Sequence, residues 1–170
     1  ASQEGVAEPL MCKFLHGIQN SVFSRGFLRT YGFDDCQPVP FTARNATAVA
    51  YHEASQRALQ AARDSGHRWD LAFVQVEDRT HQMLGDDNPY LVTKAFFLTQ
   101  QIPIQQFRFE TSQTPNQSQL AYTLSNMGLA TYAKLGGIPW LLRADPTTTH
   151  ELVVGISSSR VRTSRLSQGA

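Results

Sequence analysis

Residues 70–76 restrict the fold of this chain more than any other segment, because they form an almost continuous apolar run. A run of this length is typical of a parallel strand that is buried on both faces. Residues 47–65 before it have the periodicity of an amphipathic helix, and helical patterns return after it. This alternation predicts an α/β fold, a layered domain whose parallel sheet is flanked by helices and binds ligands at the carboxyl ends of its strands.

A second helix is predicted from residue 89 to about residue 101, because Asn88 can cap free amides and Pro89 suits the first helical position. The other predicted elements are a short strand at 39–42, a strand at 104–109 and a helix at 117–134. The composition, 41% hydrophobic over 170 residues, is enough for one good core.

Polar groups on the two later helices are predicted to share one side of the domain. Tyr90 and Lys94 are four residues apart and therefore lie on one helix face, in the first turns, where the helix dipole favours an anion. The stripe predicted to bury against the sheet consists of Leu91, Val92, Ala95 and Leu98. In the next helix the buried stripe is Leu120, Leu124, Met127 and Thr131, and the ridge on another face is Asn126, Ala130 and Lys134.

Gln105 and Gln106 lie near the start of the strand between these helices. An aromatic ring, amides and two ammonium groups that converge in this way fit a phosphorylated, base-bearing end. Taken singly, each residue has a structural explanation: Tyr90 as a half-buried aromatic, Lys134 as a complement to a helix C-terminus, Lys94 as a solvated charge. The hypothesis of nucleic-acid end recognition therefore depends on the group as a whole.

Four motifs resemble one known family. They are Tyr90-x-x-x-Lys94, residues 101–105, residues 129–140 and residues 151–156. Together they are similar to the MID domain and the opening of the PIWI domain of prokaryotic Argonaute proteins, over about residues 69–156. The resemblance implies a Rossmann-like MID domain at 47–140, after a loosely assigned segment at 1–46. It also implies that residues 141–170 are the truncated start of a PIWI domain, with the first strand of a ribonuclease H-like fold.

The resemblance implies a role for each site residue. Tyr90 would stack on the first base of a guide strand, while Lys94, Gln105 and Lys134 hold its 5′-phosphate, often with a divalent cation (Mg²⁺) that bridges the phosphate. Asn126 is a further match, Gln106 replaces Gln105 if the register differs by one, and Ala130 stands where many relatives carry a longer polar side chain. The implied partners are a single-stranded guide, with RNA favoured over DNA, and a complementary target strand.

Ser157 stands where slicing members of the family place a metal-binding aspartate. A hydroxyl is a poor ligand for a magnesium ion that hydrolysis needs held by carboxylates. The chain is therefore expected to have no catalytic residues and no metal ligands among its side chains. This pattern resembles the inactive Argonautes, some of which work with a separate effector protein, and it implies a role in prokaryotic defence.

The net charge agrees with a small binding site, and the cysteine content agrees with a reducing cellular compartment. The net charge of +1 favours a focused pocket over an extended groove. Arg160, Arg162 and Arg165 form a basic run that is either a phosphate contact or a solvated tail. With only Cys12 and Cys36, and no signal segment or membrane-length run, a reduced, cytoplasmic setting is expected. The chain is expected to be a fragment or an excised domain.

A second hypothesis comes from a different class of protein. The same cations could bind the phosphate of a metabolite in a small α/β enzyme or receptor, with Ser157 or Asp70 near the strand ends as the working group. The chain has no glycine-rich phosphate loop, no nucleophile elbow and no histidine spacing typical of a metal site. This alternative therefore has no motif of its own.

Overall fold

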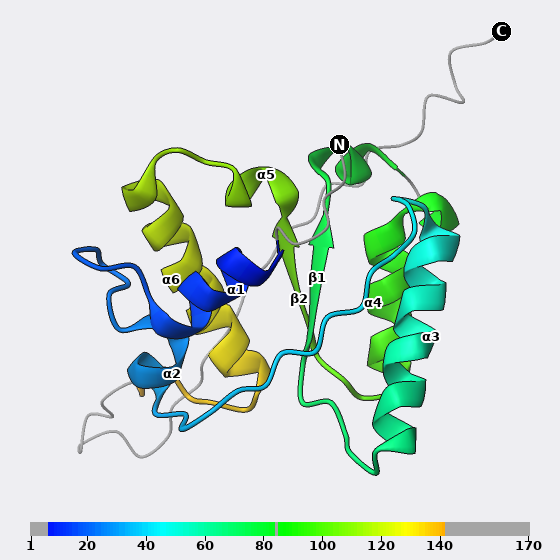
Figure 1. Cartoon of the computed structure of the whole chain (residues 1–170), viewed down its shortest axis with the longest axis horizontal. Helices are drawn as coiled ribbons and strands as arrows, with labels where there is room; N and C mark the ends of the chain where they lie inside the picture. Colours follow the sequence, from blue (N-terminus) through cyan, green and yellow to red (C-terminus); the bar gives the residue numbers. More distant parts are fainter. Residues whose placement is uncertain (1–6, 84, 142–170) are drawn as a thin grey trace, which may run out of the picture. The chain divides into compact units, whose positions relative to one another are not determined.

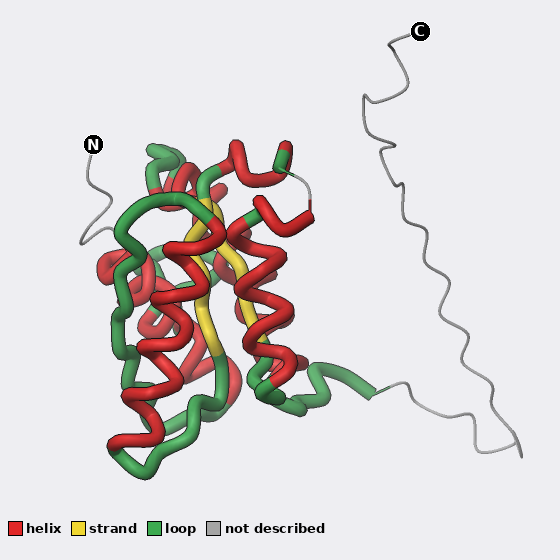
Figure 2. The backbone as a smooth tube through the Cα atoms, turned by 90° about the vertical axis from the view of Figure 1, so that its right-hand side faces the viewer, coloured by secondary structure: helices red, strands yellow, loops and turns green. Residues whose placement is uncertain are grey.

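A computed structural model describes residues 7–83 and 85–141 of this chain. The chain forms two compact units, Ala1–Pro139 and Trp140–Ala170, and the fold described here is that of the first unit. Two parallel strands lie at its centre with helices on both sides (Figures 1 and 2). Strand β1 (Ala72–Val76) pairs with β2 (Ile104–Arg108), with Ala72 opposite Ile104. The predicted α/β fold with a parallel sheet is confirmed, while the strand predicted at 151–156 lies outside the described residues.

The helices in chain order are α1 (Ala7–His16), α2 (Gly26–Tyr31), α3 (Ala48–Asp64), α4 (Pro89–Thr99), α5 (Phe109–Ser112) and α6 (Gln117–Lys134). Two short 3-10 helices, η1 (Asp78–Gln82) and η2 (Gly85–Asp87), connect β1 to α4. Helices α3, α4 and α6 were predicted from periodicity and caps, and the structure gives α6 the predicted bounds. Helices α1 and α2 were not predicted. They lie within residues 1–46, the N-terminal segment whose structure was only loosely assigned from the sequence.

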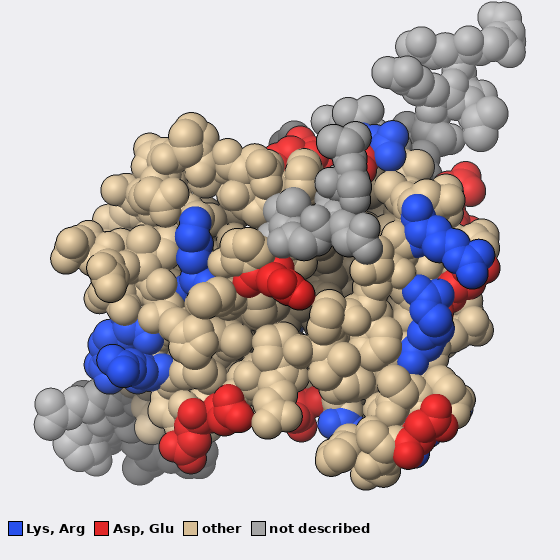
Figure 3. Space-filling model, in the orientation of Figure 1, with Lys and Arg blue, Asp and Glu red and all other residues tan. Residues whose placement is uncertain are grey.

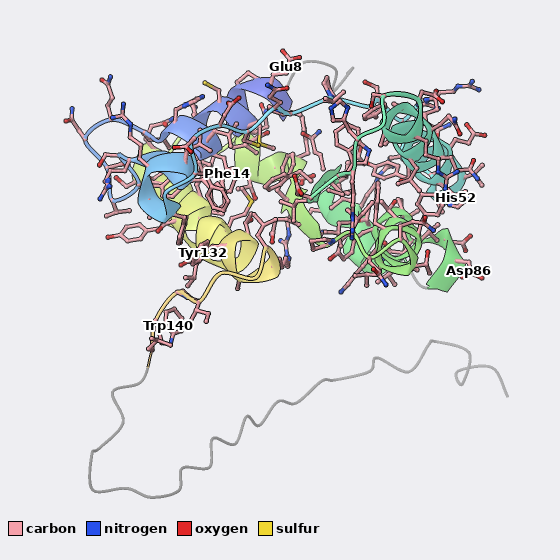
Figure 4. All side chains as sticks on the ribbon, turned by 90° about the horizontal axis from the view of Figure 1, so that it is seen from below. Glu8, Phe14, His52, Asp86, Tyr132 and Trp140 are labelled. Carbon is pink, nitrogen blue, oxygen red and sulfur yellow. The ribbon has the colours of Figure 1, made fainter. Side chains whose placement is uncertain are left out.

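One side of the sheet is covered by α1, α2 and α6, which enclose an aromatic core (Figure 4). Phe14 of α1 stacks on Phe27 of α2 with 5.0 Å between the ring centroids, and it meets Phe73 of β1 edge-on at 5.2 Å. Leu120 and Leu124 of α6 are fully buried in the same cluster, as their spacing predicted. The N-terminal helices therefore supply about as much of this core as α6 does.

The other side of the sheet is covered by α3 and α4. Val74, Val76 and Ile104 of the strands are buried there together with Ala58 of α3 and Phe97 of α4. The Tyr51 hydroxyl of α3 donates a hydrogen bond of 2.7 Å to the carbonyl of Gln75 in β1. Burial raises the pKa of Tyr51 to about 12, and the nearby Glu77 carboxylate adds to the effect. This hydrogen bond fixes α3 against the sheet.

The buried face of α4 differs from the predicted one. Leu91 and Leu98 are 46% and 51% exposed, whereas Pro89, Thr93 and Phe97 are buried. Two sets of residues in this helix have the spacing of a buried face, one with the leucines and one with Phe97. Burial of the large Phe97 ring stabilises the fold more than burial of either leucine would. Thr93 can occupy the buried face because its hydroxyl donates to the Pro89 carbonyl at 2.7 Å. The predicted stripe of Leu91, Ala95 and Leu98 is therefore wrong, and Val92 is only half-buried.

The strand predicted at residues 39–42 is also absent, since this segment connects α2 to α3 without joining the sheet. Pro38 and Pro40 lack backbone N–H groups and cannot donate to a strand ladder. A segment that has the sequence pattern of a strand, but contains two prolines, thus forms a loop.

Candidate functional site

The start of α4 is held in place by the side chain of Asn88. Its oxygen accepts hydrogen bonds from the backbone amides of Tyr90 and Leu91, at 3.0 and 3.2 Å. Its amide nitrogen donates to the carbonyls of Thr80 and Met83, at 2.8 and 3.1 Å. Asn88 therefore caps α4 and ties its first turn to η1, which fixes the position of Tyr90. The capping was predicted, but nothing in the sequence indicated the two carbonyls that Asn88 binds.

Tyr90 and Lys94 lie next to each other on α4. The Lys94 ammonium is 5.7 Å from the centroid of the Tyr90 ring, within the range of a cation–π contact. Lys94 is exposed, and the structure gives it no hydrogen bond or ion pair within the described residues. Tyr90 is half-buried and packs against the core shared by α3 and α4. The prediction that both side chains point out of the core therefore holds for Lys94 and only partly for Tyr90.

Lys134 reaches from the end of α6 to the beginning of β2. Its ammonium donates to the Ile104 carbonyl at 2.8 Å and to the Gln105 side-chain oxygen at 2.6 Å. An ammonium group has three N–H donors, so one remains for a ligand. The structure thus brings Lys134 and Gln105 together. The contact with Ile104 has no signal in the sequence, because any residue offers a backbone carbonyl.

The burial of Lys134 and its charged neighbour both affect its protonation. Partial burial lowers the pKa of Lys134, and the positive charge of Lys94 lowers it further. Lys94 and Lys134 are two of three lysines in the chain, the third being Lys13 on α1. An anion near Lys134 would oppose both effects, because it stabilises the charged form of the ammonium.

The other predicted site residues do not contact this group. Asn126 is exposed on α6, about 12 Å along the helix axis from Lys134 at 1.5 Å per residue. Ala130 lies between them and is exposed. Gln106 contributes its backbone carbonyl, which accepts from the Gln105 side chain at 2.8 Å. Since neighbouring side chains of a strand alternate, Gln106 faces away from the side on which Gln105 contacts Lys134.

The position of the site relative to the sheet corrects one expectation. Parallel sheets bind ligands at the carboxyl ends of their strands, and the sequence predicted the site there. Lys134 instead binds the carbonyl of Ile104, the first residue of β2. The reason is the direction of α6, whose last turn reaches the amino end of this strand. Lys134 and Gln105 therefore lie at the amino end of β2, whereas Tyr90 lies in the first turn of α4, which Asn88 ties to η1 beyond the carboxyl end of β1.

The side chains at this site fit an anion better than a cation. Two ammonium groups would repel a divalent ion, and the Gln105 oxygen already accepts from Lys134. Within residues 7–83 and 85–141, no group of three or more His, Cys, Asp or Glu could hold a metal. The donors present therefore do not form a magnesium site by themselves.

The lowered pKa of Lys134 predicts opposite pH trends for anion binding and stability. Below that pKa the ammonium is charged, and as the pH rises through it, a bound phosphate should lose its partner. In the window up to the ordinary value of 10.5, the unfolded chain binds a proton that the folded chain has lost, so the free energy of unfolding should rise with pH. Phosphate binding and chemical unfolding, each compared between the wild type and Lys134→Met, measure the two trends. Lys134→Arg should bind phosphate with no such pH dependence, because a guanidinium stays charged.

Lysine and arginine side chains form separate patches on the face shown in Figure 3, with acidic side chains between them. This face offers no continuous basic groove for a long polyanion.

In the part of the chain that the structure describes, no helix is long and apolar enough to cross a bilayer. Cys12 and Cys36 are exposed free thiols.

The fold and the candidate site together describe an α/β domain in which Lys134, at the end of α6, contacts the first residues of β2, and Lys94 lies beside Tyr90 on α4. A search of curated proteins finds similarity to "Protein argonaute" of Cereibacter sphaeroides (strain ATCC 17025 / ATH 2.4.3), 36% identical over 174 aligned residues. The match covers 97% of this chain and 22% of that protein, so the chain spans about a fifth of its relative. No family model matches the chain. The chain is thus similar to a segment of an Argonaute protein, as its motifs predicted.

Proposed function

We propose that this chain anchors the 5′-phosphorylated end of a guide strand, so that the guide can recognise a complementary target. The observation that carries the proposal is the Lys134 ammonium, which contacts Ile104 and Gln105 and keeps one N–H donor, together with Lys94 beside the ring of Tyr90. A terminal phosphate has a charge close to −2 at neutral pH, which two lysines balance. The relation to an Argonaute supports a nucleic-acid guide as the source of this phosphate.

In the proposed complex, Tyr90 stacks on the first base while Lys94 and Lys134 hold the phosphate. Stacking of a base on an aromatic side chain contributes about 1–3 kcal/mol, with little preference for the base. Each hydrogen bond to a charged group adds about 1.5–3 kcal/mol. A site of this size can therefore hold a strand by its end without covering its length. Asn126, which is exposed on the same helix as Lys134, is proposed to contact the strand beyond its first nucleotide.

The remaining proposals rest on the resemblance. The chain is a non-catalytic module, since Ser157 replaces a metal-binding aspartate, and it serves a defence system with RNA as its guide and a separate effector protein as a partner. A divalent cation would enter only with the phosphate, held by phosphate oxygens, because the side chains of the site favour an anion. Its binding should therefore need the 5′-phosphate.

The test of this function compares two single-stranded RNAs that differ only at the 5′ end. We expect the strand with a 5′-phosphate to bind at least about tenfold more tightly than the strand with a 5′-hydroxyl, which is the contribution of one charge-assisted hydrogen bond. Fluorescence anisotropy at fixed ionic strength, with and without Mg²⁺, measures both affinities. Equal affinity for the two strands would refute end recognition.

The alternative, a site for a phosphorylated metabolite, uses the same lysines. It predicts that inorganic phosphate or a small phosphate ester competes at low concentration and that neither RNA binds well. The same anisotropy experiment, with such competitors added, separates the two functions. The half-buried Tyr90 beside Lys94 favours the guide strand, since a base needs an aromatic surface and a small phosphate ester does not.

A further inference from the structure

The last turn of α6 is closed by two hydrogen bonds from the glycines that follow it. Gly136 has a φ of +86°, and its N–H donates to the Ala133 carbonyl at 3.1 Å. The N–H of Gly137 donates to the Tyr132 carbonyl at 2.9 Å. This is a Schellman motif, which satisfies carbonyls that have no partner within a helix. Gly136 is thus needed for its left-handed backbone conformation.

Gly137 is needed for a different reason, which is the room that the Tyr132 ring occupies. A Cβ atom at Gly137 would lie 2.4 Å from Cε2 and Cζ of this ring, far inside van der Waals contact. The ring therefore packs directly on the backbone of Gly137. Tyr31 of α2 stacks on the same ring, with 4.6 Å between the centroids and 21° between the planes (Figure 4). The end of α6 thus contacts α2 through Tyr132.

Tyr31 is itself held by the aromatic core of the N-terminal helices. Its ring lies 5.2 Å from that of Phe27, which is buried. The Phe33 ring, just after α2, meets Tyr132 edge-on at 6.3 Å. Burial raises the pKa of the Tyr31 hydroxyl, and the nearby Tyr132 hydroxyl adds to the effect. The position of Tyr132 therefore depends on the N-terminal helix pair as well as on α6.

This contact matters for the candidate site because Lys134 is the last residue of α6. Helix ends open more readily than helix interiors, and a side chain in the last turn moves with that turn. The Tyr132 ring opposes such opening, since it lies between the last turn and α2 and contacts Gly137 beyond the turn.

We infer that the helix pair α1–α2 regulates the 5′-phosphate site through the contact between Tyr31 and Tyr132. While the contact is made, the last turn of α6 is closed and Lys134 has one position. A displacement of α2 removes the ring that keeps Tyr132 beside Gly137, and the turn opens more often. Tyr31 and Tyr132 are positioning residues, which act on the phosphate without touching it. The inference rests on the proposed function, because it concerns the same phosphate.

Variants of the full chain measure the effect on binding. The quantity is the ratio of the dissociation constants for 5′-hydroxyl and 5′-phosphate RNA. Tyr31→Leu and Tyr132→Leu should each lower this ratio roughly two- to tenfold, the worth of an aromatic pair beyond its buried area. The double variant should match the single ones, because both substitutions remove the same contact. Tyr132→Phe keeps the ring and should behave as the wild type does. Independent, additive losses in the double variant would overturn the inference.

Gly137→Ala tests the other contact of the ring. The added methyl group forces the Tyr132 ring away, so this substitution should lower the ratio in the wild type. In a Tyr132→Ala background there is no ring to displace, and Gly137→Ala should then change the ratio by less than about twofold, the error of additivity. An equal loss in both backgrounds would show that the ring has no part in the effect and would overturn the inference.

Amide hydrogen exchange without any ligand separates opening of the last turn from loss of the whole fold. Leu135, Gly136 and Gly137 donate the hydrogen bonds that close α6. In Tyr31→Leu their amides should exchange faster, while amides in the middle of the helix, such as that of Leu124, keep their protection. Equal acceleration along all of α6, or none at its last turn, would contradict the inference.

The failure of this inference and the failure of the proposed function remain distinguishable. If the wild type does not prefer the 5′-phosphate, the proposed function is wrong, and amide exchange still decides whether α2 closes the last turn. Tyr122→Leu is the matched control, since Tyr122 is 60% exposed on the same helix, and it should change neither measurement. Circular dichroism checks that each variant folds, and Tyr31→Met replaces Tyr31→Leu if the latter does not.

Discussion

Replacing Lys134 with methionine is expected to remove most of the preference for a 5′-phosphate, while binding of the 5′-hydroxyl strand changes little. The expected loss is about 1.5–3 kcal/mol, or roughly 10- to 150-fold in the dissociation constant. Lys94→Met should act in the same direction with a smaller effect, since Lys94 is exposed and more screened by solvent than Lys134. Methionine keeps most of the length and apolar surface of lysine, so the comparison isolates the charge.

Lys13→Met is the control for these two variants, because it removes the same charge from α1, on an element that takes no part in the candidate site. It should lower the affinity for both strands equally and only slightly. Anisotropy with the two RNAs measures all three variants under one salt concentration. Losses of equal size for the phosphorylated and hydroxyl strands in Lys134→Met would mean that this lysine attracts the backbone of the strand and not its end.

The order of the central elements could be predicted from the sequence, because each has a local cause. The apolar run that became β1, the Asn88 cap of α4 and the periodicity of α6 are all properties of short segments. Helices α1 and α2 have no comparable signal. Their aromatic residues, such as Phe14 and Phe27, are stabilised by contacts with each other and with β1, which a local pattern does not reveal.

The rotation of α4 could not be predicted for a related reason. Leu91 with Leu98 and Thr93 with Phe97 are both possible buried pairs at helical spacing, and only the packing partners decide between them. In the structure Phe97 is buried against Ala58 and the strands, and the two leucines are exposed. Local periodicity thus predicted the position of the helix correctly, but it predicted the wrong buried face.

The candidate site, like the fold, could be predicted only in part. The spacing of Tyr90 and Lys94, and the resemblance to Argonaute, identified two pairs of side chains that are in contact, Tyr90 with Lys94 and Gln105 with Lys134. The anchoring of Lys134 on the Ile104 carbonyl could not be predicted, because a backbone group carries no mark in the sequence. For the same reason the sequence did not indicate that Lys134 contacts the amino end of β2.

Tyr90 gives the second large effect that we expect. Tyr90→Leu should weaken the binding of phosphorylated and hydroxyl strands alike, by about 1–3 kcal/mol or roughly 5- to 150-fold, because it removes the surface on which the first base stacks. Leucine retains apolar contact with the core that Tyr90 covers, so the fold should persist. Tyr90→Phe keeps the ring and should bind almost as the wild type does. Anisotropy with both strands measures these variants.

The decisive comparison for Tyr90 uses an RNA whose first nucleotide lacks its base. If the ring stacks on that base, the wild type should bind the abasic strand about as weakly as Tyr90→Leu binds the intact strand, and Tyr90→Leu should lose nothing further. If Tyr90 instead supports the site only by packing, the substitution should cost the same affinity with or without the base. A cation–π contact with Lys94 at 5.7 Å contributes in both cases, so it cancels from the comparison. The ratio of the two losses therefore tells whether the candidate site recognises a nucleotide or only its phosphate.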